Sequence, residues 1–445
     1  MSFQIPIRAV LFDTTFLRDI LPLIIFLLLL GVIAINGSIE IKLNQDLLVK
    51  FCFYYLAWGL FIILVWVAMG VNPLSAFREY RNHIFPLMLF FVARNTLNSS
   101  HYRNKLINLL FTILMIYLIT TIIEYLFIKV FNFFPGIFPW YAYTFLTDDR
   151  YITNLTGNIA DDPTLYIHPE FTPILGLAGF SHSSAAIVMV LVGFCYPFLF
   201  NKNKLKKRNI VNSLPRLSNY PDWICYLIVF LIAFVIFLVY GAKMHMVSFL
   251  LLLLFLPIFL KNMNYRKNII VILFFILIVL SSSSIRAILL ERLLNALLGS
   301  YVTDIGRIYD LNEFGGGSLG AIFAVNPISA VFSQPIFPII FGSFENLGVS
   351  ELRLLSYTLH FGLLWLILYL GIYITALINS RKIISNRFVK QSDYMFACGT
   401  FCFLFICFLD MLHYARPMTW PIIDFFAVCI GSTSTILIPK KGYQS

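Results

Sequence analysis

Side chains that could act on an anionic substrate gather in one polar stretch, residues 281–356, between two strongly apolar segments. Four arginines belong to this stretch: Arg286, Arg292, Arg307 and Arg353. A guanidinium stays charged in any surroundings and binds phosphate oxygens through two hydrogen bonds. The arginines therefore predict a diphosphate site. The alternative interpretation is that they form structural bridges to carboxylates such as Glu291 and Glu351.

Glu351 precedes a predicted helix that continues through Tyr357 and His360. The helix dipole favours a carboxylate at this position, from which it could take a proton from a hydroxyl group. The position suits an ordinary first-turn acid equally well. We interpret Glu351 as the candidate catalytic base and Tyr357 as a further candidate, and we expect His360 to be a packed, hydrogen-bonded histidine.

Other polar residues stand where apolar segments begin, on the side that lacks basic loops. They are His182 in Gly-Phe-Ser-His-Ser-Ser, Lys243 and His245 in a short turn, His413 and Arg416 before the last apolar segment, and Arg150 in an aromatic-rich stretch. His182 is a second catalytic candidate, although it could simply lie in a serine-capped first helical turn. Lys243 and Arg416 could bind the same anion, and the alternative for Lys243 is snorkelling to the interface.

The composition excludes a soluble globular protein. The chain is 60% hydrophobic and 17% aromatic, and windows of about twenty apolar residues recur along it, as in helices that span lipid. Irregular backbone in lipid would leave amide groups unpaired, so the spans must be helical. We predict an all-α polytopic integral membrane protein with 11 or 12 transmembrane helices.

The basic residues fix the predicted orientation. The net charge is +11, and the lysines and arginines gather in short loops at 201–208, 261–267 and 380–390 and in the C-terminal tail. Such loops stay in the cytoplasm, so a nucleic-acid partner is not expected. Residues 131–180 and the polar stretch then lie outside.

Three regions follow from this pattern. Residues 1–281 carry eight predicted transmembrane helices and the aromatic-rich segment at 131–180, residues 282–354 form a helical periplasmic cap, and residues 355–445 carry the last helices and a cytoplasmic tail. Predicted spans include 50–69, 83–97, 106–130, 182–200, 223–240, 245–260, 355–378, 393–411 and 417–438.

Several kinds of chemistry are not expected. The seven cysteines all lie in apolar stretches, with no other metal-ligating side chains at a suitable spacing. We therefore interpret them as small packing residues. The sequence has no nucleotide-binding glycine motif and no HExxH or GxSxG motif. No metal and no cofactor are predicted. An activated substrate outside the cytoplasm must arrive on a carrier, for which a lipid diphosphate is the natural choice.

Taken together, these features resemble the bacterial O-antigen polymerase and O-antigen ligase superfamily (Wzy and WaaL). The resemblance covers most of residues 80–438, in architecture more than in identity. It rests on residues 179–184, the turn with Lys243, Arg307 followed by a helical run to Pro338 and Gly342, residues 351–362, and His413. Ligases typically carry a histidine eleven residues before a glycine, where this chain has Glu351 and Gly362. In this respect the chain is similar to polymerases. Relatives often show Ser-Arg where this chain has Ala242-Lys243.

The resemblance implies a metal-independent inverting glycosyltransferase with a GT-C-like fold, active in lipopolysaccharide biosynthesis at the periplasmic face of the inner membrane. It would transfer a growing glycan from undecaprenyl diphosphate to the non-reducing end of a lipid-linked repeat unit. The implied partners are undecaprenyl diphosphate-linked oligosaccharides as donor and acceptor, membrane lipids, and a polysaccharide chain-length regulator.

Two other functions fit the same sequence. One is an O-antigen ligase with the same fold. The other is a flippase for lipid-linked sugars, which would need polar residues along a path at mid-membrane. Here polar residues concentrate at the outer face, and Glu124 and Asp424 are the few that look deep. This distribution favours the polymerase.

Overall fold

The computed structural model describes residues 46–133, 174, 176–177, 181–199, 221–240, 243–260, 269–273, 336–344, 353–386, 389–411 and 422–437. The first half of the described chain contains α3 (Leu47–Ala68), α4 (Pro73–His83), η1 (Phe85–Met88), α5 (Leu89–Thr96), α6 (Ser100–Tyr125), η2 (Leu126–Val130) and α9 (Ser181–Leu199). It continues with α10 (Asp222–Phe234), η8 (Val235–Tyr240), α11 (Lys243–Phe259), α17 (Ile336–Phe341), α18 (Arg353–Phe361), α19 (Leu363–Ser385), α20 (Gln391–Met411), α21 (Ile422–Ser434) and η10 (Thr435–Leu437). These elements are all helical, which confirms the predicted all-α class for the described part of the chain.

Four of the described helical segments are long and apolar enough to cross a membrane: Leu47–Ala68, Ser100–Val130, Leu363–Ser385 and Gln391–Met411. Four shorter apolar helices accompany them: Ser184–Leu199, Asp222–Phe237, His245–Phe255 and Ile422–Ser434. Large apolar side chains also point outward, for example Leu64 at 68% exposure on α3 and Leu109 at 55% on α6. A soluble protein would hide such surface, so this is a helical membrane protein. The count of 11 or 12 spans stays a prediction.

One group of helix ends is held together by two arginines. Arg103, near the start of α6, bonds Asp393 at the start of α20 and Thr435 just after α21. Arg94, near the end of α5, pairs with Asp46 before α3 and bonds Ser434. We call this side the basic end.

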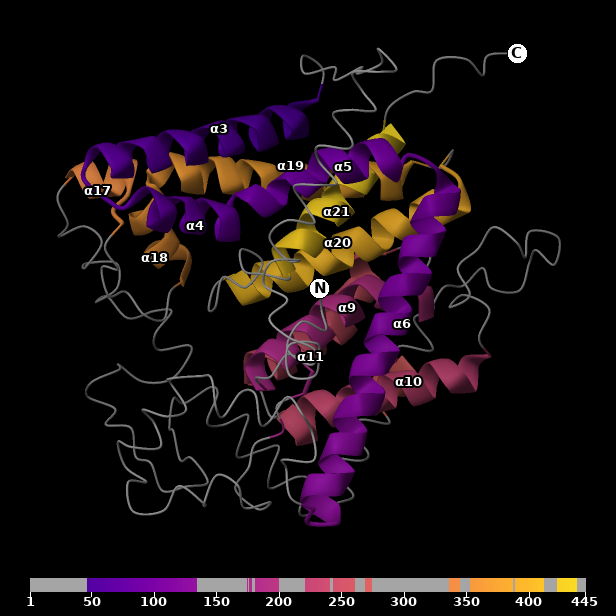
Figure 1. Cartoon of the computed structure of the whole chain (residues 1–445). Coiled ribbons are helices and arrows are strands. Elements are labelled where there is room, and N and C mark those ends of the chain that lie inside the picture. Colours follow the sequence, from indigo (N-terminus) through magenta and orange to yellow (C-terminus); the bar gives the residue numbers. More distant parts are fainter. Residues whose placement is uncertain are drawn as a thin grey trace, which may run out of the picture.

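The opposite ends of the same helices form what we call the distal end. α3 and α19 run antiparallel and side by side (Figure 1), because Phe51 lies against Gly371 while Trp58 bonds Phe361. α9 and α20 are also antiparallel, since Gly193 packs on Cys402 and Gly399 packs on Phe194. The ends of α3 and α6 and the starts of α9, α11, α18 and α19 therefore lie at the distal end. These directions agree with the alternation expected from the basic loops.

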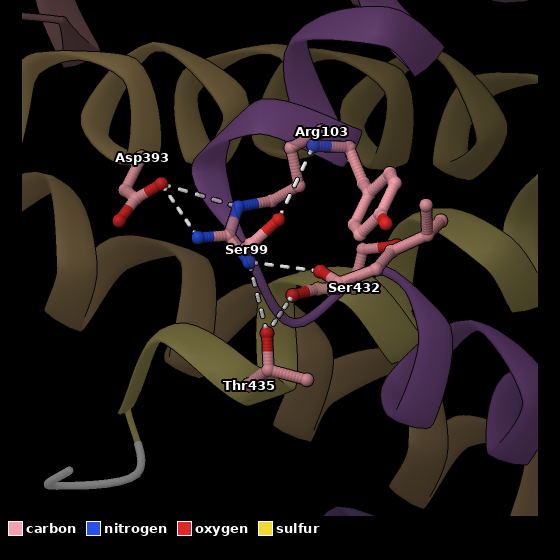
Figure 2. Close-up of polar contacts among 7 residues, drawn as sticks. Ser99, Arg103, Asp393, Ser432 and Thr435 are labelled. Carbon is pink, nitrogen blue, oxygen red and sulfur yellow. Dashed lines mark hydrogen bonds and ion pairs between the residues drawn. The ribbon is translucent and has the colours of Figure 1, made fainter.

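Figure 2 shows the polar contacts around Arg103 at the basic end. The Arg103 guanidinium donates to Oδ1 of Asp393 from Nε at 3.1 Å and from Nη2 at 2.6 Å. Its Nη1 donates to the Leu97 carbonyl at 2.9 Å and to Oγ1 of Thr435 at 3.1 Å. A buried charge persists only when it is paired and hydrogen-bonded. Arg103 therefore ties α6, α20 and the segment after α21 together.

Two predicted spans were wrong in outline. The segment predicted as one span over 83–97 is the end of α4 followed by two short helices, η1 and α5. The segment predicted as one span over 355–378 is broken at Gly362, whose φ of +87° interrupts the helix between α18 and α19. Apolar composition alone does not reveal such a break, because both sides of it are apolar.

The seven cysteines are buried, and none of them forms a disulfide. They line the contacts between helices, where a small side chain allows close approach. Their predicted role as packing residues is confirmed.

Substitution Arg103→Ala should lower the unfolding free energy by about 3–5 kcal/mol, because it leaves Asp393 buried without its partner. The matched control is Lys105→Ala on the same helix, where the side chain is exposed and the change should stay within about 0.5 kcal/mol. The measurement is an unfolding titration with sodium dodecyl sulfate in mixed micelles. Equal effects of the two substitutions would show that the pair does not tie the helices together.

Candidate functional site

α4 is a short helix at the distal end that differs from the apolar helices around it. Asn72 caps its start, accepting from the Leu74 amide at 2.9 Å, and Pro73 occupies the first turn, where its fixed φ suits a helix. Tyr80 on this helix is buried against α3. Glu79 and His83 are four residues apart and therefore share one face.

The ends of α4 and α18 are held side by side by α3 (Figure 1). The Tyr55 hydroxyl donates to the carbonyl of His83 at 3.3 Å, and the Trp58 indole donates to the carbonyl of Phe361 at 3.0 Å. The last carbonyls of a helix have no partner within the helix. Two side chains of α3 thus satisfy two helix ends and fix them next to each other.

A pair of glycines fixes the position of α18 against α17. Gly342 has a φ of +79°, and a Cβ there would lie 2.2 Å from the His360 carbonyl oxygen. A Cβ on Gly362 would lie 2.3 Å from the Ile340 carbonyl oxygen. The amide of Ser343 also donates to the carbonyl of Leu359 at 2.8 Å. The two backbones are in contact, and only glycine fits at both crossing points.

This scaffold brings Glu79 between two histidines from different helices. Oε2 of Glu79 lies 3.3 Å from Nε2 of His83 and 3.7 Å from Nε2 of His360. Hydrogen bonding from His360 and from His83 holds the pKa of the Glu79 carboxyl well below its usual range, against an opposing effect of partial burial. Glu79 is therefore ionised at any physiological pH.

Aromatic rings surround this group, which we call the Glu79 site (Glu79, His83 and His360). The ring centroid of His360 lies 4.7 Å from that of Trp66 and 6.1 Å from that of Phe344. The His83 ring lies 5.0 Å from Tyr357. No three potential ligands within the described residues are placed to hold a metal ion. The site can accept and donate hydrogen bonds and exchange a proton.

A second polar group, the Glu124 site, joins α6, η8 and α9 at the distal end. Glu124 is fully buried, and its Oε1 accepts from the Gly176 amide at 3.1 Å. Thr121 bonds the Tyr240 hydroxyl at 2.7 Å. A Cβ on Gly176 would meet both that hydroxyl and Oγ of Ser184. Four segments distant in sequence thus bring their polar groups together.

Glu124 lies near the end of its membrane span rather than in the middle. It follows Arg103 by 21 residues on one helix, which is about 31 Å at 1.5 Å per residue. The hydrocarbon core of a bilayer is about 30 Å thick. Arg103 and Glu124 therefore fit opposite membrane surfaces. This position revises the expectation from sequence that Glu124 is a deep charge.

The structure places five of the predicted site residues. His182 lies in the first turn of α9, Lys243 begins α11 and Arg353 begins α18. His245 is buried in the first turn of α11, and Tyr357 lies in α18 beside His83. The starts of α9 and α11 adjoin the Glu124 site, whereas Tyr357 belongs with the Glu79 site. The other predicted residues lie outside the described residues: Arg150, Arg286, Arg307, Glu351, His413 and Arg416.

Sequence reasoning missed Glu79 and His83. A usable signal was present, since a capped start at Asn72-Pro73 is followed by a glutamate and a histidine at a spacing of four, between two apolar segments. The partnership with His360 had no local signal, because the two residues are 281 positions apart (360 − 79). His360 is packed against Trp66, as expected, and its Nε2 lies 3.7 Å from Oε2 of Glu79.

Comparisons with known proteins leave the family of the chain open. A scan against protein-family models found no match, and searches of curated proteins and of solved structures found none either.

The close contact between the backbones after α17 and α18 predicts that a methyl group added at Gly362 destabilises the protein. Gly362→Ala should destabilise the protein by several kcal/mol, because the new Cβ meets a backbone oxygen as well as a strained φ. Gly70 is the matched control: its φ is +92°, yet nothing lies within 4 Å of the added Cβ. Gly70→Ala should cost only the conformational strain, about 1–2 kcal/mol. Thermal unfolding of both variants in detergent measures the difference, and equal losses would argue against the close crossing.

Acid should weaken the Glu79 contacts. The folded-state pKa of Glu79 is lowered, so its carboxylate contributes stability above the unfolded value of about 4.3 and loses that contribution as the pH falls below it. The stability difference between the wild type and Glu79→Gln should therefore shrink between pH 5 and pH 3.5. Melting temperatures of the two proteins at each pH measure it. A difference that stays constant would mean that the carboxylate is not held by the histidines.

Proposed function

We propose that the chain is a polymerase of O-antigen or a related surface polysaccharide, as its sequence resemblance suggests. It would transfer the growing glycan from undecaprenyl diphosphate to the non-reducing end of a lipid-linked repeat unit. The observation that carries this proposal is that three helix starts, those of α9, α11 and α18, lie on the same side of the described helices, the distal end. These starts bear His182, Lys243 and Arg353.

Helix starts favour anions. The unpaired amides and the dipole at a helix N-terminus attract negative charge. The sequence adds a basic or imidazole side chain within the first two residues of each of these three helices. A diphosphate that projects from the membrane surface matches this arrangement. Arg286, Arg307 and Arg416 would complete the anion site, and they are proposed here from the sequence alone.

The reaction needs two elements of chemistry. A base removes the proton from the acceptor hydroxyl as its oxygen attacks the anomeric carbon of the donor, and the bond from that carbon to the diphosphate breaks with inversion. The charge that develops on the leaving diphosphate is stabilised by the cations, in the place of a metal. Glu351, two residues before α18, is the proposed base.

The positions of the described charges favour a transferase over a flippase. A flippase requires polar groups along a path through the middle of the membrane. Here the buried Arg103 and Asp393 lie at the basic end and the buried Glu124 lies at the distal end. Asp424 on α21 lies between the two ends, ten residues before Ser434 (434 − 424), and a single such residue does not make a path. In this proposal the distal end faces the periplasm of a bacterial inner membrane, residues 282–354 cover it, and the arrangement is of the GT-C type.

A reconstitution experiment tests the proposal. The purified protein in lipid nanodiscs, given undecaprenyl diphosphate-linked repeat units and EDTA, should yield a ladder of lengthening products. Glu351→Gln should lower the rate by about 10²–10⁴-fold if Glu351 is the base. Arg353→Ala should lower it by about 10²–10³-fold through loss of charge stabilisation. Lys382→Ala, an exposed cation at the basic end, is the control and should leave the rate unchanged.

Other outcomes point elsewhere. Transfer of a single unit onto another lipid without a ladder would indicate a ligase. Movement of the lipid-linked sugar between leaflets without any transfer would indicate a flippase and overturn the proposal.

A further inference from the structure

The Glu79 site has open hydrogen-bonding atoms. Both histidine contacts use Oε2 of Glu79 and the Nε2 atoms. Within the described residues, the contacts of Glu79 and His360 with each other and with His83 leave Oε1 of Glu79 and Nδ1 of His360 without a hydrogen-bond partner. The indole Nε1 of Trp66 is buried and also lacks a partner there, and its ring is the nearest aromatic neighbour of His360 after Phe361. One acceptor, one imidazole nitrogen and one N–H donor therefore remain to be satisfied.

The site is open enough to receive a ligand. The relative solvent exposure of the side chain is 29% for Glu79, 18% for His83 and 19% for His360. Phe344 and Tyr357 flank them and are half-buried. α4, α18 and the end of α3 hold these groups on three helices, so the geometry does not depend on a single loop.

The chemistry of the open atoms selects the class of ligand. An ionised carboxylate repels phosphate, so the site does not suit the diphosphate itself. A metal ion would need three convergent ligands, which this site does not offer. A sugar ring suits it, because hydroxyl groups donate to a carboxylate and to an imidazole nitrogen. Aromatic walls with a few convergent polar groups are typical of small-molecule sites.

The position of the site relates it to the proposed reaction. His360 follows Arg353 by seven residues on α18, which is two helical turns and about 10 Å. Arg353 is a proposed diphosphate ligand. A ring bound at His360 would therefore belong to a glycan near that diphosphate.

We propose that Glu79 and His360 bind a sugar ring of the lipid-linked acceptor beside the buried ring of Trp66. Glu79 accepts from a hydroxyl through Oε1, and His360 pairs with a second hydroxyl through Nδ1. His83 is a positioning residue, because it holds the Glu79 carboxylate. The identity of the glycan rests on the proposed function, whereas the binding of a polyhydroxylated ring does not.

Steady-state kinetics with lipid-linked repeat units test this assignment. Glu79→Gln and His360→Phe should each raise the acceptor KM by about 10-fold to 100-fold, the effect of losing hydrogen bonds to a charged or buried group. They should leave kcat within about threefold, as expected for lost ground-state binding. Arg78→Gln, an exposed position on the same helix, is the control and should change neither constant. An unchanged KM with a reduced kcat would overturn the assignment.

A binding titration separates this inference from the proposed function. The oligosaccharide released from the same repeat units should quench tryptophan emission of the wild type, should not do so in Trp66→Phe, and should need about 10-fold more ligand in Glu79→Gln. Melting curves confirm that each variant is folded, and Glu79→Asp replaces Glu79→Gln if the latter unfolds. If no ladder forms but quenching depends on Glu79 and Trp66, the polymerase proposal fails and the sugar site stands. If a ladder forms but the oligosaccharide causes no such quenching, the sugar site is wrong and the polymerase proposal is unaffected.

Discussion

A polar group that is out of contact with water gains stability from a partner inside the protein, and this constraint explains the main polar contacts between the described helices. It explains why Arg103 collects an aspartate, a carbonyl and a hydroxyl from three segments at the basic end. It also explains why Tyr55 and Trp58 reach out from α3 to the last carbonyls of α4 and α18. Tyr55 and Trp58 lie in the middle third of α3, so such pairing also occurs between the two ends.

The distal end contains two polar groups of different character. The Glu124 site holds a buried carboxylate beside the starts of α9 and α11, and in our proposal it is these helix starts, with His182 and Lys243, that bind the diphosphate. The Glu79 site presents an ionised carboxylate among aromatic rings and favours neutral hydroxyl groups. An enzyme that joins a lipid diphosphate to a sugar hydroxyl requires both environments close to one membrane surface. Our two proposals therefore assign the diphosphate to the helix starts and the sugar hydroxyl groups to the Glu79 site.

The sequence predicted the class of the fold well and its details unevenly. Apolar windows found α3, α6, α19 and α20, because length and composition decide whether a helix can span lipid. They could not locate the break at Gly362, which depends on backbone contact with Ile340. The candidate site was predicted through single residues at helix starts, and His182, Lys243 and Arg353 do lie at such starts. Glu79 and His83 were missed because the site that they form also requires His360, which is far away in the sequence.

A cryo-EM structure with an undecaprenyl diphosphate-linked repeat unit bound would test the central claim most directly. We expect the diphosphate at the distal end, at the starts of α9, α11 and α18, with a sugar ring of a lipid-linked glycan against Glu79 and His360. A lipid headgroup bound at the basic end beside Arg103, or a glycan threaded through the middle of the helices, would contradict it.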